Sequence, residues 1–451
     1  MSSSVTSPRG NLLDGNPWAT LWSLCWPLVL TMVMNAAIGL LDTWIAGRLG
    51  PVSQAAVGLS MQLIMLVNAA IMATSIGCQA LVARFVGAEN WEDAARSAQQ
   101  TLLLGLWVTS LVLVPVYLLA PALFQAMGAT PAVQAEGTGY LRLLLLGLFA
   151  MDLNILLHAV FRARGRPMAI LVSNTVEAIV WISCSLALGL YAGWGLAGLA
   201  TGFIAGKTAG MIVSGWLFRK SRLFAHITSP WRSDWGWFKR ILKIGLPAGV
   251  QVIARNFGML AYFAILGLLA HPTEAVAAFS ISFRIESIAF FPVFALNIAA
   301  ATMVGQNLGA KRPEEAAAMG WRIAGVAMVI MTGFALFFYL SADALVARFT
   351  DDPLVASYAA DYLRIIALSE PFLGVAMVLN GAFQGAGEAR VPMIITLLTQ
   401  VLLRLPLAWG LAVPLGLGTT GAWWAMTASM WLQGAIVVWL FQRGKWKERE
   451  V

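Results

Sequence analysis

The chain has few charged residues, few cysteines and few histidines, and each shortage excludes a class of protein. Only 11% of its 451 residues are Asp, Glu, Lys or Arg, whereas an average soluble domain has about 25%. Cys25, Cys78 and Cys184 lie in separate apolar stretches without C-x-x-C spacing, so we expect neither a disulfide framework nor a zinc site. The three histidines form no ligand cluster in the sequence, and we expect no metal and no bound cofactor.

Apolar residues dominate the chain instead and make up 59% of it. They form runs longer than the ~18 residues that cross the hydrocarbon core of a bilayer. Helices are the expected form because they satisfy their own backbone groups in lipid, and strand-like alternation is absent from the sequence. The sequence therefore predicts an all-α integral membrane protein with twelve transmembrane helices, near residues 18–47, 53–82, 95–120, 137–162, 167–191, 195–218, 238–268, 274–302, 317–342, 356–384, 391–413 and 418–442.

The sequence contains an internal repeat. Residues 86–94 return as residues 308–316, which is 222 positions later, and Tyr140-Leu141-Arg142 returns as Tyr362-Leu363-Arg364 at the same distance. Each copy has six spans, an even number, so both copies start on the same side of the membrane and lie parallel. Internally duplicated membrane proteins of this kind are typically transporters, with their sites near the midplane between the halves.

The repeat also predicts the domain organisation. We expect an N-lobe over residues 1–218, a cytoplasmic linker over residues 219–240 and a C-lobe over residues 241–451. The linker contains several tryptophans and bases, a combination that favours the headgroup layer of a membrane. A plain solvated connector is an almost equally good interpretation of the linker.

Lysine and arginine are distributed asymmetrically along the chain. The formal net charge is +8, and most of the 29 bases fall at the termini or in the loops that follow even-numbered spans. Only Arg48, Arg142, Arg348 and Arg364 fall near the opposite side. This pattern follows the positive-inside rule and predicts a multi-pass protein of the cell inner membrane with both termini cytoplasmic. The basic excess orients the protein, so we expect no nucleic-acid partner.

Two local patterns are interpreted as turns. Residues 193–198 and 416–421 both satisfy G-x-G-x-x-G, but each follows an apolar span rather than a strand, so neither predicts a nucleotide site. They are expected to be equivalent turns before spans six and twelve. In the repeated segment, Asn90 with Asp93 resembles a helix N-cap, and Pro313 suits a first helical position.

Ionisable residues inside spans are costly in lipid and are therefore the candidate functional residues. Asp42, in the outer half of span one, is the first candidate, and Asn35 lies seven residues earlier on nearly the same helix face. A carboxyl group in an apolar, partly wet cavity can exchange a proton under physiological conditions. We expect Asp42 and Asn35 to take part in cation or proton coupling. The alternative is that Asp42 is a structural acid paired with a base in another span.

Span five carries the second part of the expected coupling site. Asn174 and Glu177 are three residues apart, so they share a helix face and can contribute to one cavity. Pairing of Glu177 with Lys207 of span six is an equally good interpretation. Glu286, two residues from Arg284, is expected to pack or to pair with another span. The polar span residues that we assign to a substrate cavity are Asp152, Asn154, Lys207, Gln251, Arg255 and Arg284.

Four motifs carry a family resemblance, and they lie in spans one, eight and eleven and in the second repeat element. They are residues 41–43 with 47–50, residues 277–281 through Pro292, residues 404–408, and residues 304–310. With these motifs the chain resembles the multidrug and toxic compound extrusion (MATE) family. The resemblance implies a V-shaped transporter of two six-helix lobes that exchanges cytoplasmic drugs or metabolites for inward-moving H⁺ or Na⁺. It also implies that Asp42 is the family's first-span acid, which is implicated in cation coupling.

Two departures from the family pattern bear on the coupling ion. Sodium-type members carry a glutamate in span seven where this chain has Arg255. Their span-ten aspartate has no match around Gly374, and the nearest acid is Glu370. The resemblance therefore implies proton coupling through the N-lobe, as in the DinF-like branch, with Na⁺ as the alternative. That branch pairs the first-span acid with an Asn and an Asp of span five, which Asn174 and Glu177 match approximately.

The expected function is that of a secondary antiporter that exports amphipathic, often cationic, compounds by alternating access. Its expected partners are a small-molecule substrate and the lipid bilayer, and we expect it to act as a monomer. A lipid-linked saccharide flippase of the same superfamily is the alternative, because Arg255, Arg284 and Arg404 are bases that would suit a pyrophosphate. We do not expect an enzyme, since the spans carry no H-E-x-x-H motif and no Ser/His/Asp set.

Overall fold

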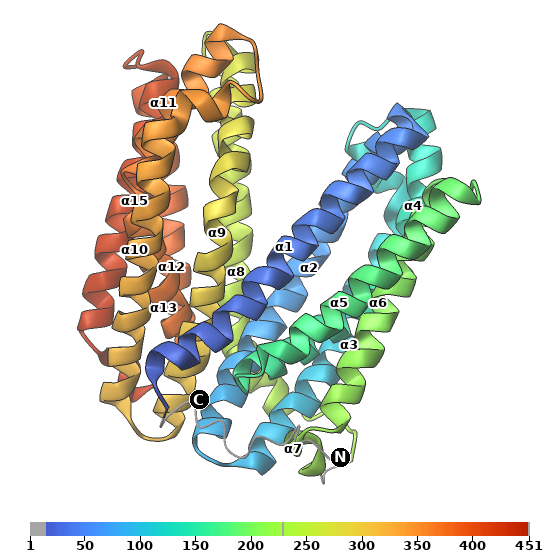
Figure 1. Ribbon diagram of the computed structural model, residues 1–451, viewed down its shortest axis with the longest axis vertical. Helices are drawn as coiled ribbons and strands as arrows, with labels where there is room; N and C mark the ends of the chain where they lie inside the picture. The colour runs from blue at the N-terminus through green and yellow to red at the C-terminus, as the bar shows by residue number, and fades with distance from the viewer. Residues whose placement is uncertain (1–14, 228–229, 450–451) are drawn as a thin grey trace. The chain divides into compact units, whose positions relative to one another are not determined.

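The computed structural model describes residues 15–227 and 230–449, and in this part of the chain the regular elements are all helices (Figure 1). Eleven helices among the described residues are long and apolar enough to cross a membrane. A further pair, α11 and α12, is bent by 57° at a short break and makes the twelfth when it is counted as one span. The predicted all-α membrane fold with twelve spans is therefore confirmed.

The first six spans are formed by α1 (Pro17–Leu49), α2 (Pro51–Gly87), α3 (Trp91–Ala126), α4 (Pro131–Ala163), α5 (Pro167–Cys184) continued by the π-helical η1 (Ser185–Tyr191), and α6 (Leu196–Arg219). The last six are formed by α8 (Trp235–Leu266), α9 (Pro272–Gly309), α10 (Pro313–Val346), α11 (Pro353–Ala367) with α12 (Glu370–Gly385), α13 (Arg390–Thr396) continued by the π-helical η2 (Leu397–Leu403) and α14 (Arg404–Ala412), and α15 (Gly418–Gln442). Two short helices, α7 (Arg222–Ala225) and η3 (Lys445–Glu448), lie outside the spans.

Contacts within the chain divide it into two compact units. One unit, Ser23–Leu246, contains most of α1 together with α2 to α6, and α4 packs against both α2 and α6 in it. The other unit comprises, of the described residues, 15–22 and 247–449, and α9 packs against α12 in it. We refer to them as the N-unit and the C-unit.

The internal repeat predicted from the sequence is visible in the backbone. Among the described residues, Glu89 and Lys311 are the non-glycine residues with positive φ, at 56° and 59°, and they occupy equivalent repeat positions. Each follows the end of a long helix and precedes the start of the next. As predicted, Asn90 caps α3 by accepting a hydrogen bond from Asp93 N at 3.1 Å, and Pro313 is the first residue of α10.

The two glycine motifs form the predicted equivalent turns. Gly193 and Gly195 have φ values of 71° and 57°, and Gly416 and Gly418 have φ values of 69° and 57°. These left-handed conformations favour glycine because a Cβ atom would be strained there. The turns lead into α6 and α15, and the spans that precede them contain the π-helical segments η1 and η2.

The segment between α6 and α8 is attached to α3 of the same unit. The Arg96 guanidinium donates to Asp234 at 2.8 Å, and Gln100 accepts from Asp234 N at 2.9 Å. Trp107 Nε1 donates to the Ser233 hydroxyl at 3.1 Å. The pKa of Asp234 lies below its ordinary value: slight burial raises it, but backbone donors and the Arg96 guanidinium lower it by more. These contacts attach Ser233 and Asp234 to α3.

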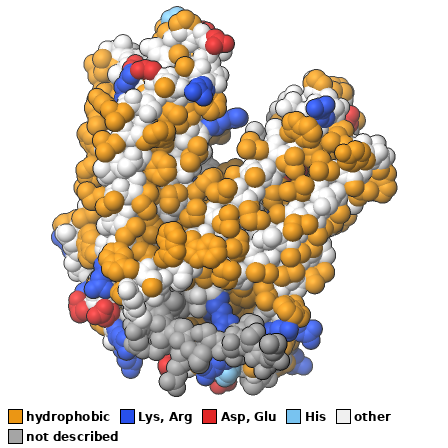
Figure 2. Space-filling view, viewed as in Figure 1, with side chains coloured by type: hydrophobic (Ala, Val, Ile, Leu, Met, Phe, Trp, Pro, Cys, Tyr) orange, Lys and Arg blue, Asp and Glu red, His pale blue; other side chains and the backbone are white. Residues whose placement is uncertain are grey.

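Hydrophobic side chains cover the sides of the helices in each unit, and charged side chains gather toward the helix ends (Figure 2). The exposed flanks include Leu111, Leu118, Val329 and Leu340. Helices that cross lipid must present apolar side chains outward, because a charged side chain at the bilayer centre is costly. The few ionisable residues that lie within the spans and are buried therefore need a specific explanation.

Candidate functional site

Four helices of the N-unit bring polar side chains into one buried group. We call this group the N-unit cluster, and its members are Asp42 of α1, Asn154 and His158 of α4, Ser173, Glu177 and Trp181 of α5, and Lys207 and Ser214 of α6. Glycine lets α6 approach α5 here. A Cβ atom on Gly210 would lie 2.6 Å from Glu177 Oε2 and 2.9 Å from Asn154 Nδ2. The cluster therefore depends on a missing side chain as well as on polar ones.

An ion pair occupies the centre of the N-unit cluster. The Lys207 ammonium donates to Glu177 Oε1, and Asn154 Nδ2 donates to Glu177 Oε2 at 3.0 Å. Lys207 Nζ also lies 4.9 Å from the centre of the Trp181 ring, a distance typical of a cation–π contact. Of the two interpretations of Glu177, the structure therefore shows the pairing with Lys207.

Hydroxyl and imidazole groups extend the cluster along α4. The Ser214 hydroxyl lies 2.6 Å from Asn154 Oδ1 and 2.8 Å from Ser173 Oγ. Ser173 Oγ in turn donates to Gly210 O at 2.9 Å. His158 Nε2 lies 3.4 Å from Ser173 Oγ and 3.3 Å from Ser214 Oγ, and its donor or acceptor role depends on the tautomer. These contacts hold Asn154 in the orientation in which its amide donates to Glu177.

Asp42 lies at the edge of this cluster and is only 7% exposed. Its carboxyl group faces the Trp181 indole, and its charge interacts with Lys207 and with Tyr140. Trp181 Nε1 is buried without a hydrogen-bond partner of good geometry. Because Glu177 already pairs with Lys207, the ionised forms of the two acids leave one negative charge in excess. That excess charge distinguishes Asp42 from an acid with its own basic partner.

Two other residues were predicted for the coupling site, Asn174 and Asn35. Asn174 is near Glu177 on the same helix, whereas Asn35 is two helical turns from Asp42. Asn174 is buried on α5, one turn before Glu177. Asn35 lies about 10 Å from Asp42 along the axis of α1, and its side chain is exposed. Two helical turns thus separate the buried Asp42 from the exposed Asn35, and a joint role of the two stays a prediction.

The residues assigned to a substrate cavity are divided between the two units. Asp152, on α4, accepts from Thr109 of α3 at 2.6 Å and so points away from Asn154. In the C-unit, Gln251 donates to Thr396 Oγ1 at 3.0 Å. Arg255 and Arg284 are exposed on α8 and α9. Of the assigned cavity residues, Asn154 and Lys207 belong to the N-unit cluster.

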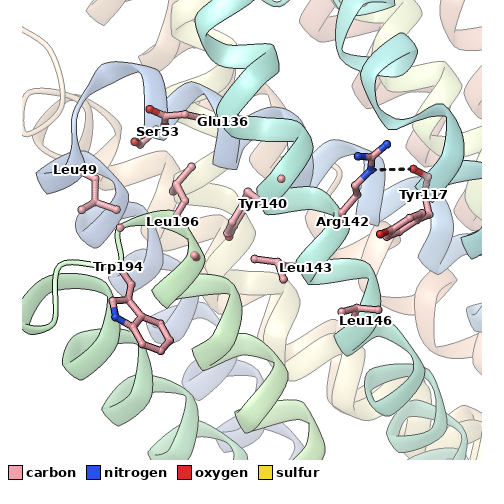
Figure 3. A pocket seen from close by; sticks show the side chains of 13 residues that line it. Leu49, Ser53, Tyr117, Glu136, Tyr140, Arg142, Leu143, Leu146, Trp194 and Leu196 are labelled. Carbon is pink, nitrogen blue, oxygen red and sulfur yellow. Dashed lines mark hydrogen bonds between the residues drawn. The ribbon is translucent and has the colours of Figure 1, made fainter.

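A pocket of about 610 Å³ adjoins the N-unit cluster at the end of the unit predicted to face outward (Figure 3). Its polar lining includes Glu136, which accepts from Ser53 at 2.8 Å. Arg142 also lines it, donates to Tyr117 O at 3.4 Å and lies 5.2 Å from the centre of the Tyr117 ring. Tyr140 lines the pocket too and interacts with Asp42, so it lies between pocket and cluster.

Sequence reasoning missed several members of the cluster, although the sequence carries a signal for them. Ser173 and Trp181, which were missed, lie four residues before and after the predicted Glu177 on α5, a spacing that places all three on one helix face. Tyr140 was marked by the repeated Tyr-Leu-Arg segment, but the repeat did not indicate a role. In the described residues, no group of three or more His, Cys, Asp or Glu side chains is arranged to hold a metal ion.

Comparison with known proteins places the chain among membrane transporters. A family model described as MatE matches residues 27–186 and 247–409. A "probable multidrug resistance protein NorM" of Thermotoga maritima is 26% identical over 439 residues, which cover 96% of this chain and 93% of that protein. The NorM counterpart of Mesorhizobium japonicum is 28% identical, with 93% and 92% covered. The "multidrug resistance protein PmpM" of Pseudomonas aeruginosa is 26% identical, with 88% and 82% covered.

Solved structures share the fold over almost the whole chain. A crystal structure of "MATE in the straight conformation" has a TM-score of 0.88 at 22% identity and covers 97% of this chain and 98% of its own. The Vibrio cholerae MATE transporter VcmN in its bent form also has a TM-score of 0.88, at 21% identity, with 94% and 96% covered. The TM-scores establish a common fold, and at identities this low the likeness shows the fold alone.

Proposed function

The chain belongs to the MatE family, and from that membership we propose that it is a secondary active antiporter that exports cationic, amphipathic compounds in exchange for protons. The multidrug resistance names of its NorM and PmpM relatives support a drug-like substrate. Its twelve spans make it a multi-pass membrane transporter, and the bacterial relatives support a place in the inner membrane. We further propose that the N-unit cluster is where the proton binds.

The observation that carries this proposal is the charge balance of the N-unit cluster. Glu177 and Lys207 neutralise each other, whereas Asp42 is buried without a base of its own. An isolated charge in a medium of low polarity is costly, so such a carboxylate tends to take up a proton or to pair with a cation. A proton and a cationic substrate would thus compete for the same charge on Asp42.

Competition of this kind is what an exchanger requires. Binding of a proton removes the charge that holds a cationic substrate, and release of the proton restores it. A ligand drives a conformational change only through different affinities for the two states. If the two states expose Asp42 to opposite sides of the membrane, proton binding outside and release inside drive the substrate outward. Tyr140, which lines the pocket, interacts with the charge of Asp42.

The flippase alternative has less support from the residues that suggested it. Arg404 donates to Ser429 Oγ at 2.7 Å inside the C-unit, and its charge interacts with Glu286. It is therefore committed within the unit rather than available to a pyrophosphate. Arg255 and Arg284 are exposed and remain compatible with either function.

Transport by purified protein in proteoliposomes tests the proposed function. The substrate is a fluorescent lipophilic cation, and the driving force is either an imposed pH gradient or, separately, a Na⁺ gradient at constant pH. We expect accumulation under the pH gradient and none under the Na⁺ gradient. Accumulation driven by Na⁺ alone would refute proton exchange. Failure to move any cation, together with translocation of a lipid-linked saccharide, would favour the flippase.

A further inference from the structure

A second buried group of titratable side chains lies in the C-unit. Glu286 of α9 and Glu370 of α12 are both 0% exposed, and each carboxyl group acts on the other. The Tyr362 hydroxyl of α11 donates to Glu286 Oε2 at 2.6 Å. We call Glu286 and Glu370 the C-unit pair. Sequence reasoning expected Glu286 to pack or to pair with another span and assigned no role to Glu370.

The C-unit pair lacks hydrogen-bond donors if both carboxyls are ionised. Glu286 Oε1 and both carboxyl oxygens of Glu370 are buried without a donor. An ionised carboxylate is only an acceptor, and two like charges in contact in an apolar interior repel each other. A single proton removes both problems, because a protonated carboxyl donates to its ionised neighbour.

The groups around the pair compensate one negative charge. The charge of Arg404, from α14, acts on Glu286, and its Nη2 is buried without a partner. Tyr262 of α8 is 2% exposed, its hydroxyl is also without a partner, and it interacts with Arg404. From α15, Met426 contacts the Tyr362 hydroxyl and Ser429 contacts Arg404, and both of these side chains are uncharged. One arginine and one remaining carboxylate therefore make a neutral group when the pair holds one proton.

The backbone around the pair is irregular. Glu370 is the first residue of α12, where span ten bends by 57°. Arg404 follows the π-helical η2 directly. Interrupted spans and π-helical segments are common at ion and substrate sites, because they free backbone groups and re-aim side chains.

The repeat adds a second, independent observation. Tyr362 is the counterpart of Tyr140, 222 residues earlier in the chain. Tyr140 interacts with Asp42, and Tyr362 donates to Glu286, so each copy places the same tyrosine against a buried acid. The acids themselves come from helices that are not equivalent in the repeat, α1 and α9. The C-unit pair is therefore not a duplicated copy of the Asp42 site.

We propose that Glu286 and Glu370 form a second proton-binding site, in which two carboxyls share one exchangeable proton beside Arg404. Uptake of the proton joins the two carboxyls by an O–H···O hydrogen bond and breaks no other bond. Its release leaves two carboxylates for one guanidinium. This binding does not require that Asp42 couples transport, although its use in the transport cycle rests on the proposed proton exchange.

Infrared spectroscopy of the full chain in lipid nanodiscs tests this site, because protonated carboxyl groups have their own C=O band. We expect the wild-type band to weaken as the pH is raised. The protonated carboxyl of the C-unit pair contributes one part of this band, and Glu286→Gln or Glu370→Gln should each remove that part completely. In either variant the new amide donates to the remaining carboxylate, so no proton is needed. Glu314→Gln is the matched control, since that side chain is 84% exposed.

Two outcomes would overturn the proposal. The first is a carboxyl band that neither glutamine variant changes. The second is a band that both variants remove but that does not respond to pH, which would make the pair a permanently protonated structural contact. If a glutamine variant does not fold, Tyr362→Phe replaces it, and its band should persist to higher pH because the carboxylate has lost a donor. The Asp42→Asn variant should keep the part of the carboxyl band that comes from the C-unit pair. Failure of this site and failure of the Asp42 proposal are therefore distinguishable.

Discussion

Replacing Asp42 by asparagine tests the charge balance of the N-unit cluster most directly. The amide keeps the shape of the carboxyl group, and its oxygen can still accept a hydrogen bond from Trp181 Nε1, which has no other partner. The variant removes a buried excess charge and leaves the Glu177–Lys207 ion pair intact. We therefore expect it to fold and insert normally, with a stability within about 1 kcal/mol of the wild type.

The expected loss of transport in Asp42→Asn follows from the charge count. One excess carboxylate binds one proton, so one proton is exchanged in each transport cycle. A gradient of one pH unit is worth about 1.4 kcal/mol per proton, which is a tenfold ratio of substrate concentrations. Asp42→Asn should thus lower the accumulation ratio of a fluorescent cation about tenfold for each unit of imposed pH gradient. Asp42→Glu should retain part of the wild-type accumulation, because it keeps the titratable group.

The assay measures the steady-state ratio of the cation in proteoliposomes at several pH gradients. Asp152→Asn is the matched control, because Asp152 is another buried acid of the N-unit but bonds to Thr109 outside the cluster. That control should accumulate the cation like the wild type. An Asp42→Asn variant that keeps the wild-type ratio and pH profile would refute the reasoning and place the coupling proton elsewhere.

Three further predictions concern the ion pair, the coupling ion and the topology. Lys207→Met should lower the free energy of unfolding by about 3–5 kcal/mol, because it leaves the buried Glu177 carboxylate without its partner. The double variant Lys207→Met with Glu177→Gln should recover most of this loss in thermal unfolding in detergent. A wild-type-like Lys207→Met variant would contradict the buried pair. Arg255→Glu should make transport responsive to Na⁺, because the fixed positive charge that repels a cation becomes a carboxylate. If a Na⁺ gradient still drives no uptake in this variant, Arg255 does not determine the coupling ion. A single cysteine at Ala88 should label from the cytoplasmic side and one at Thr130 from outside, and labelling of both from one side would contradict the orientation.

The sequence alone was sufficient for the fold class and the repeat. Lipid solvates no backbone groups, so every span must be a long apolar helix, and its length and composition are readable along the chain. The capped turn at Asn90 and the glycine turns were also predictable, because they depend on residues that are neighbours in sequence. For the same reason the excess of bases on one side predicts an orientation without any tertiary contact.

The partners of the buried acids were decided by tertiary structure. The sequence left Glu177 with two interpretations, and only the approach of α6 at Gly210 shows the pairing with Lys207. It likewise placed Asn35 on nearly the same face as Asp42, although packing buries one and exposes the other. The C-unit pair was beyond sequence reasoning, since Glu286 and Glu370 lie on separate spans. Contacts between helices depend on the rotation of each helix about its axis and on how closely two backbones approach, and hydropathy along a single chain measures neither.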